Sequence, residues 1–130
     1  TGLDAFEWIS ELHDIGVGEI ILTSINNEGT GKGLDLKLYE KITNLSSISF
    51  LAHGGTKNPQ DVLELFKKTS VDGVIISSGF HFNYAQELLN KKRLDKFGGS
   101  SYLLKGEKKK LSFGIREIKE YLDREGVNIR

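Results

Sequence analysis

Three short apolar runs, separated by amphipathic stretches, constrain the fold of this chain more than any other feature of its sequence. The runs are Ile20–Ile25, Ile48–Ala52 and Val74–Ile76, and each is too short for a helix. Strands that recur about every 25 to 30 residues, with a helical pattern in each interval, are typical of repeated βα units with parallel strands. The first run is apolar on both faces, which predicts a strand that is covered on each side. We therefore expect an α/β fold.

The amphipathic stretches predict helices in the order α-β-α-β-α-β-α. Their apolar residues recur at helical spacing from Leu3 to Ile15, from Leu34 to Leu45, from Val62 to Phe66 and from Ile115 to Leu122. Asn58 and Pro59 are typical of a helix start, and Ser112 is a candidate cap for the last helix. The rhythm is disturbed between Phe82 and Leu111, where Tyr84 to Leu94 could be helical and the rest is expected to be irregular.

The amino-acid composition limits the classes of function that this chain can have. The 130 residues, of which 38% are hydrophobic and 28% charged, suit one compact domain. Lys plus Arg equals Asp plus Glu at 18 each, so no overall field attracts nucleic acid or an anionic membrane. There is no cysteine, no apolar run long enough for a membrane helix and no signal peptide, so we expect a cytoplasmic protein. The chain has no Met and begins with Thr1, so we expect that something upstream has been removed or lies outside the numbering.

Glycine and hydroxyl residues follow each expected strand, at the edge where parallel βα folds bind their ligands. His53-Gly54-Gly55 follows the second strand, and Ser77-Ser78-Gly79 follows the third. Backbone amides, serine hydroxyls and bare glycine backbone at neighbouring strand ends predict a phosphate cradle. The alternative is that the glycines only make tight turns. Thr23 and the loop that contains Gly29 are candidates for a second contact with substrate.

The titratable residues identify no complete catalytic set. His53 could be a ligand contact or a general acid-base group, but no paired carboxylate lies near it in the sequence. No residue spacing resembles a metal site, and no cofactor motif is present. The basic run Lys108–Lys110 is interpreted as a solvated loop, because the chain as a whole is neutral.

Four segments together resemble the C-terminal part of the cyclase subunit of imidazole glycerol phosphate synthase. They are Ile21–Thr30, Ala52–Gly55, Ser77–Phe82 and Ile118–Arg130. The resemblance runs through nearly the whole chain except Asn83 to Lys110. It implies that residues 1–130 are the C-terminal portion of one (βα)8 TIM barrel, namely its last three βα units and the preceding helix, with an irregular insertion at residues 83–110.

The resemblance also implies an activity. Family members are lyases of histidine biosynthesis that take ammonia from a glutaminase partner and convert a phosphorylated ribulosyl-aminoimidazole intermediate into imidazole glycerol phosphate and an aminoimidazole carboxamide ribotide. Their two catalytic aspartates lie on the first and fifth strands, neither of which is in this chain, so the chain alone is expected to be inactive. By motif match, the residues expected to bind substrate and its phosphate are Thr23, Gly29, His53, Gly54, Gly55, Ser77 and Ser78.

Three departures from the family pattern leave the substrate open. Asn26 and Glu28 stand where the family usually has aspartate, His53 stands where it usually has serine, and residues 83–110 are additional. These changes resemble divergent paralogues that act with an amidotransferase on nucleotide-linked or surface sugars. A second alternative is a non-catalytic, phosphate-binding barrel fragment that serves assembly.

Overall fold

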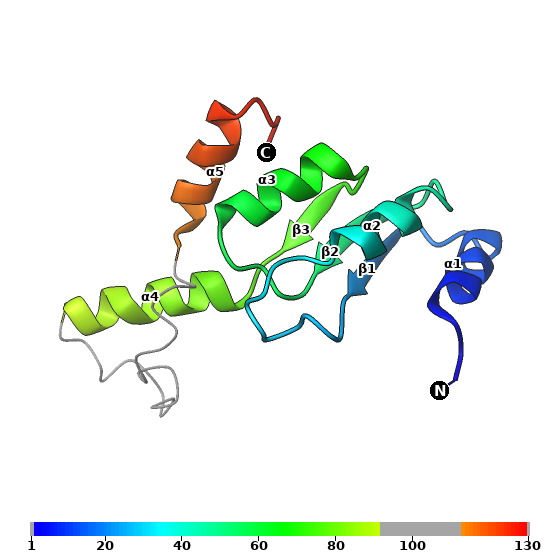
Figure 1. Cartoon of the computed structure of the whole chain (residues 1–130), viewed down its shortest axis with the longest axis horizontal. Coiled ribbons are helices and arrows are strands. Elements are labelled where there is room, and N and C mark those ends of the chain that lie inside the picture. The colour runs from blue at the N-terminus through cyan, green and yellow to red at the C-terminus, as the bar shows by residue number, and fades with distance from the viewer. Residues whose placement is uncertain (1, 92–112, 130) are drawn as a thin grey trace.

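A computed structural model describes residues 2–91 and 113–129 (Figure 1). The elements follow one another as α1 (Ala5–Asp14), β1 (Glu19–Thr23), α2 (Leu36–Thr43), β2 (Ser49–His53), α3 (Pro59–Lys68), β3 (Gly73–Ile75), α4 (Ser78–Asn90) and α5 (Ile115–Arg124). The prediction of alternating helices and strands is confirmed. The lysine run at 108–110 and the expected cap Ser112 lie outside the described residues.

The three strands form one parallel sheet in the order β1-β2-β3. Its register pairs Thr23 with His53 and His53 with Ile75, so the carboxyl ends of the strands lie level with one another. The predicted parallel arrangement is confirmed, and it brings the three segments that follow the strands to one edge of the sheet.

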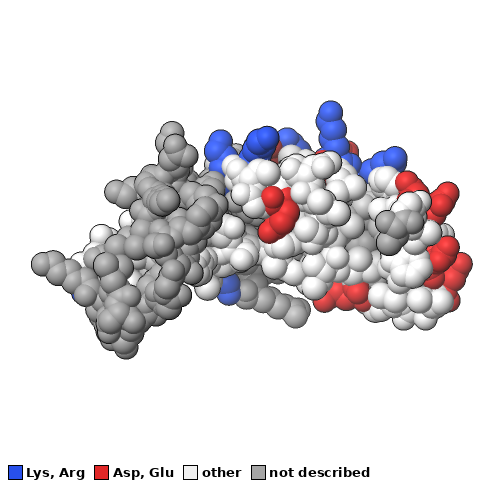
Figure 2. All heavy atoms as spheres, turned by 90° about the horizontal axis from the view of Figure 1, so that it is seen from below, with Lys and Arg blue, Asp and Glu red and all other residues white. Residues whose placement is uncertain are grey.

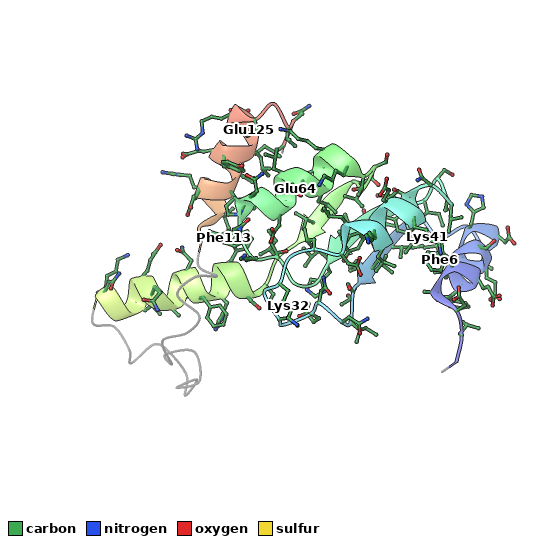
Figure 3. All side chains as sticks on the ribbon, viewed as in Figure 1. Phe6, Lys32, Lys41, Glu64, Phe113 and Glu125 are labelled. Atoms are coloured by element: carbon green, nitrogen blue, oxygen red, sulfur yellow. The ribbon has the colours of Figure 1, made fainter. Side chains whose placement is uncertain are left out.

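The core lies between the sheet and the helices α2 and α3, which Figure 1 shows in front of the strands. Its fully buried side chains are Tyr39, Ile42, Phe50, Val62 and Leu65. Helix α5 packs on α3, and a hydrogen bond between the Tyr121 hydroxyl and Gln60 links these two helices. Helix α1 is joined to α2 by the Lys41 ammonium, which lies 4.0 Å from the centroid of the Phe6 ring (Figure 3).

The prediction that the first strand is covered on both faces is wrong for the described residues. Ile20 and Leu22 point to the core, whereas Ile21 is 59% exposed on the opposite face. Ile25, predicted to end this strand, lies beyond it and is 87% exposed. The reason is that α2 and α3 pack on the same face, so the other face of the sheet has no covering layer among the described residues.

Helix α4 begins earlier than the sequence predicts. Ser78 and Gly79 were expected in a loop, but they form the first turn of this helix, which continues to Asn90. The phenyl ring of Phe113 packs against Gly79 in this first turn, where a Cβ would lie 2.5 Å from the ring. Phe80 packs edge-to-face on Phe113 with ring centroids 5.6 Å apart, which ties the helix start to the segment before α5. The last helix is preceded by Gly114 as its cap.

Candidate functional site

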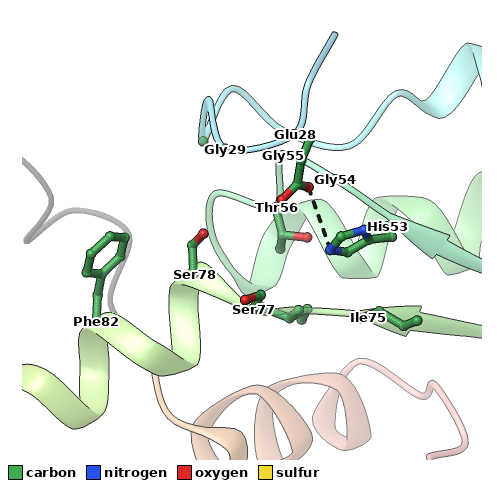
Figure 4. Close-up of a pocket in the computed structure, with 12 residues that line it drawn as sticks. Glu28, Gly29, His53, Gly54, Gly55, Thr56, Ile75, Ser77, Ser78 and Phe82 are labelled. Atoms are coloured by element: carbon green, nitrogen blue, oxygen red, sulfur yellow. Dashed lines mark ion pairs between the residues drawn. The ribbon is translucent and has the colours of Figure 1, made fainter. Parts of the chain in front are cut away.

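A pocket lies at the carboxyl ends of the strands, and the close-up in Figure 4 shows the residues that line it. Six of the seven predicted binding residues line this pocket: Gly29, His53, Gly54, Gly55, Ser77 and Ser78. The seventh, Thr23, does not line it but contacts His53 directly. The structure therefore brings the predicted residues together, and their contact with a substrate stays a prediction.

Tight packing between two loops accounts for the glycine pair. Gly54 and Gly55 have φ angles of +109° and +89°, a region that favours glycine. A Cβ on Gly55 would lie 2.5 Å from the carbonyl oxygen of Gly33 and 2.8 Å from the Cβ of Asn27. The Gly33 amide donates a 2.8 Å hydrogen bond to the Gly55 carbonyl. The Cβ side of Gly55 thus faces the loop after β1, which gives this glycine a packing role. Its contact with a phosphate stays a prediction.

The first turn of α4 supplies the donors that face the pocket. Ser77 immediately precedes the helix, and its carbonyl accepts a 3.0 Å hydrogen bond from the His81 amide. The amides at the start of an α-helix have no partner within the helix and carry partial positive charge, which favours a bound anion. Ser77 and Ser78 add two hydroxyl groups at this position. Ser77 and Ser78 suit phosphate because they lie at the start of a helix. The glycine pair was expected to suit it because its backbone is bare.

His53 is held between a hydroxyl and a carboxylate. Its Nδ1 lies 3.1 Å from the Thr23 Oγ1, because the parallel register places the two residues side by side. Its Nε2 lies 3.6 Å from the Glu28 Oε2 (Figure 4). Glu28, from the loop after β1, is therefore the carboxylate beside His53. The sequence alone paired no carboxylate with this histidine. A protonated imidazole here would neutralise the single carboxylate among the residues that line the pocket.

Tyr39 supports the strand ends from the buried side. Its hydroxyl donates a 2.5 Å hydrogen bond to the His53 carbonyl and lies 3.4 Å from the Leu22 carbonyl. The side chain is 1% exposed, and burial raises the pKa of the phenol above its usual value of 10.0. The sequence assigned Tyr39 no role, because nothing local shows that its hydroxyl reaches β2.

Replacing Tyr39 with phenylalanine tests this support. We expect Tyr39→Phe to lower the free energy of unfolding at pH 7 by about 1 to 2 kcal/mol, because buried carbonyls lose their donor. In the wild type, the contribution of the neutral phenol is complete below pH 10 and is lost as the pH rises through the elevated folded pKa. Urea midpoints measured from pH 7 to 11 should therefore fall more steeply for the wild type than for Tyr39→Phe. Parallel pH profiles would contradict this role.

The pocket also contains residues that the sequence did not assign to it, among them Thr56, Ile75 and Phe82. Thr56 could have been assigned to the pocket from the sequence, because it directly follows Gly54 and Gly55. Phe82 lies one turn into α4, whose early start was not predicted. His81 is exposed on this helix.

Within residues 2–91 and 113–129, no group of three or more His, Asp or Glu side chains could hold a metal ion. In the same part of the chain, no helix has the length and apolarity that crossing a membrane requires.

The sequence model of a family described as histidine biosynthesis protein matches residues 1–86, which is more than half of the chain. The chain belongs to this family. The matched segment contains all three strands and the loops after β1 and β2 that line the pocket, and it ends inside α4.

Similar curated proteins include several named imidazole glycerol phosphate synthase subunit HisF. The protein of Nitrosopumilus maritimus is 37% identical over 99 residues, which are 72% of this chain and 37% of that protein. The protein of Methanobrevibacter smithii is 42% identical over 83 residues, 64% of this chain and 30% of that protein. A Bacillus cereus protein is 40% identical over 85 residues, 65% of this chain and 34% of that protein. The chain thus spans about a third of the length of the relatives that it matches.

Proposed function

We propose that this chain is part of a cyclase of the imidazole glycerol phosphate synthase type that acts in the cytoplasm. The observation that carries the proposal is the pocket at the strand ends, where the glycine turn of β2 meets the first turn of α4. Family membership supports the same reaction, since the curated relatives are HisF subunits. The substrate would be the phosphorylated ribulosyl-aminoimidazole intermediate, and a glutaminase subunit would supply ammonia.

The fold that we propose for the complete protein is a (βα)8 TIM barrel, of which residues 1–130 form the last three βα units and the preceding helix. Three parallel strands cannot close on themselves, because closure at this geometry takes about eight. The open face of the sheet, with Ile21 exposed, would become the inner wall of that barrel. The remaining strands would carry the two catalytic aspartates that the family resemblance implies.

Within the pocket, we assign one terminal phosphate of the substrate to the first turn of α4. Ser78→Ala is the local test, because the serine hydroxyl can donate to a charged oxygen while the helix amides stay in place. We expect phosphate-ester affinity in the full-length protein to fall by about tenfold, as for a hydrogen bond to a charged group. Gly29, His53 and Thr23 would contact the substrate farther from this phosphate.

One observation favours a second candidate function. The Glu28 and His53 side chains meet at 3.6 Å at positions where the family usually has aspartate and serine. This pair reshapes the site beside the phosphate, as expected for a paralogue that acts with an amidotransferase on nucleotide-linked or surface sugars. The same pocket would then hold the phosphate of a different substrate.

Ammonia-driven consumption of the ribulosyl intermediate distinguishes the two candidates. The full-length wild type and His53→Ser are compared, with ammonium salt and with glutamine plus the partner glutaminase. We expect robust wild-type turnover, most of which His53→Ser retains, because serine restores the donor usual in the family. Failure of both proteins under both conditions would contradict the histidine-pathway assignment and favour the sugar-modifying paralogue.

A further inference from the structure

Thr56 is a buried hydroxyl residue in the pocket that the proposed function does not use. It follows Gly55 directly and precedes α3, and only 8% of its surface is exposed. Figure 4 shows its side chain among those of Glu28, His53 and Ser77, all of which line the same pocket. The hydroxyl is thus enclosed by the polar groups that surround the proposed phosphate site.

The Thr56 Oγ1 has no hydrogen-bond partner among the described residues. The other described threonines all have one: Thr23 on His53, Thr30 on the Asn27 carbonyl, Thr43 on the Tyr39 carbonyl and Thr69 on the Leu65 carbonyl. Burial of an unpaired hydroxyl costs free energy that valine, of the same shape, would avoid. A threonine at this position therefore points to a partner that arrives from outside the chain.

The charges around Thr56 indicate what that partner is. No Lys or Arg is among the described residues that line the pocket, and Figure 2 shows that cations gather along one edge of the molecule while the face in view is mostly uncharged. An anion in the pocket would depend on neutral donors, namely the first-turn amides of α4 and hydroxyl groups. Thr56 adds a donor with the right chemistry, since a hydroxyl proton can turn toward any nearby acceptor.

We propose that Thr56 is a specificity residue of this site, whose hydroxyl donates a hydrogen bond to an oxygen of the bound phosphate monoester. The inference rests on the proposed phosphate site and adds to it a third hydroxyl beside Ser77 and Ser78. Thr56 comes from the turn after β2, so it would hold the phosphate from the side opposite α4. A phosphate held from two strand ends would have a fixed orientation. The position of the rest of the substrate would then be fixed as well.

Thr56→Val and Thr56→Ser test the proposal in the full-length protein by calorimetric titration with inorganic phosphate and with glycerol phosphate. We expect Thr56→Val to weaken both by about tenfold or more, the effect of deleting a hydrogen bond to a charged group. Thr56→Ser keeps the hydroxyl and should stay within about threefold of the wild type. Without ligand, Thr56→Val should be at least as stable as the wild type, because it deletes an unpaired buried hydroxyl.

Thr69→Val is the matched control. Its hydroxyl donates a 2.7 Å hydrogen bond to the Leu65 carbonyl at the far end of α3, away from the pocket. We expect the opposite signature, namely lower stability without ligand and unchanged phosphate affinity. This contrast separates a ligand contact from a general effect of removing a threonine hydroxyl.

The outcomes distinguish this inference from the proposed site itself. If Ser78→Ala weakens phosphate and Thr56→Val does not, the Thr56 hydroxyl is satisfied by water and the inference is overturned while the site stands. If the wild type binds neither probe, or if neither Ser78→Ala nor Thr56→Val weakens binding, the phosphate site and the inference fail together. Weaker binding in Thr56→Val, with normal binding in Thr56→Ser and Thr69→Val, supports the inference.

Discussion

Replacing Gly55 with valine is expected to destabilise the site so strongly that phosphate-ester binding is lost. Any Cβ at this position would meet the Gly33 carbonyl oxygen at 2.5 Å and the Asn27 carbonyl oxygen at 2.9 Å, both backbone atoms that cannot turn away. The φ of +89° adds strain for a β-branched residue. Together, overpacking and strain should cost about 3 kcal/mol or more.

Gly55→Val would damage the site by displacing the loop after β1. Gly55 and Gly33 are joined by a backbone hydrogen bond, and the Asn27 side-chain amide donates a 2.9 Å hydrogen bond to the Gly33 carbonyl. Separating these groups would displace residues 26–33, which carry Glu28 and Gly29 to the pocket. The site would therefore be lost although the valine side chain does not itself point at the phosphate.

Gly16→Ala is the control for the left-handed backbone alone. Gly16 follows α1 outside the pocket and has a φ of +78°, but a Cβ there would meet nothing within 4 Å. We expect a cost of about 1 kcal/mol from strain and little change in phosphate affinity. Denaturant unfolding and phosphate titration of the full-length variants provide both readouts. A Gly55→Val protein with wild-type stability and affinity would place the phosphate cradle elsewhere.

The 130-residue chain by itself is expected to self-associate. One face of its sheet is uncovered among the described residues, with Ile21 59% exposed, and β1 and β3 are both edge strands there. Unpaired strand edges beside an exposed apolar face favour pairing with another chain. Sedimentation velocity should show dimers or larger species, and a hydrophobic dye should bind.

Substitutions at two similarly exposed residues test whether the open sheet face causes the self-association. Ile21→Thr keeps a β-branched residue on the open face and removes apolar surface, so it should reduce association and dye binding. Leu45→Thr changes a residue that is 57% exposed after α2, away from the sheet face, and should leave both unchanged. A sharp monomer with cooperative unfolding and no dye binding in the wild-type chain would contradict the open-sheet interpretation.

The local pattern of apolar and polar residues determined the order of helices and strands, the parallel sheet and the edge where the candidate site lies. Runs such as Ile48–Ala52 need little distant information, because their length and composition favour a buried strand. A helix between consecutive strands then makes parallel pairing the natural outcome. His53 and Ser77 could thus be assigned to one edge from the sequence, as could their neighbours Gly54 and Ser78.

The tertiary structure decided what each of these residues does. Glu28 reaches His53, and Tyr39 reaches the His53 carbonyl, only because loops and helices from different βα units converge on one strand end. The close approach of Gly33 gave Gly55 a packing role that the sequence did not show. Phe113 packs against the first turn of α4 from more than 30 residues away in the sequence. Distances of a few ångströms between segments far apart along the chain have no local signature, since they depend on how the whole core packs.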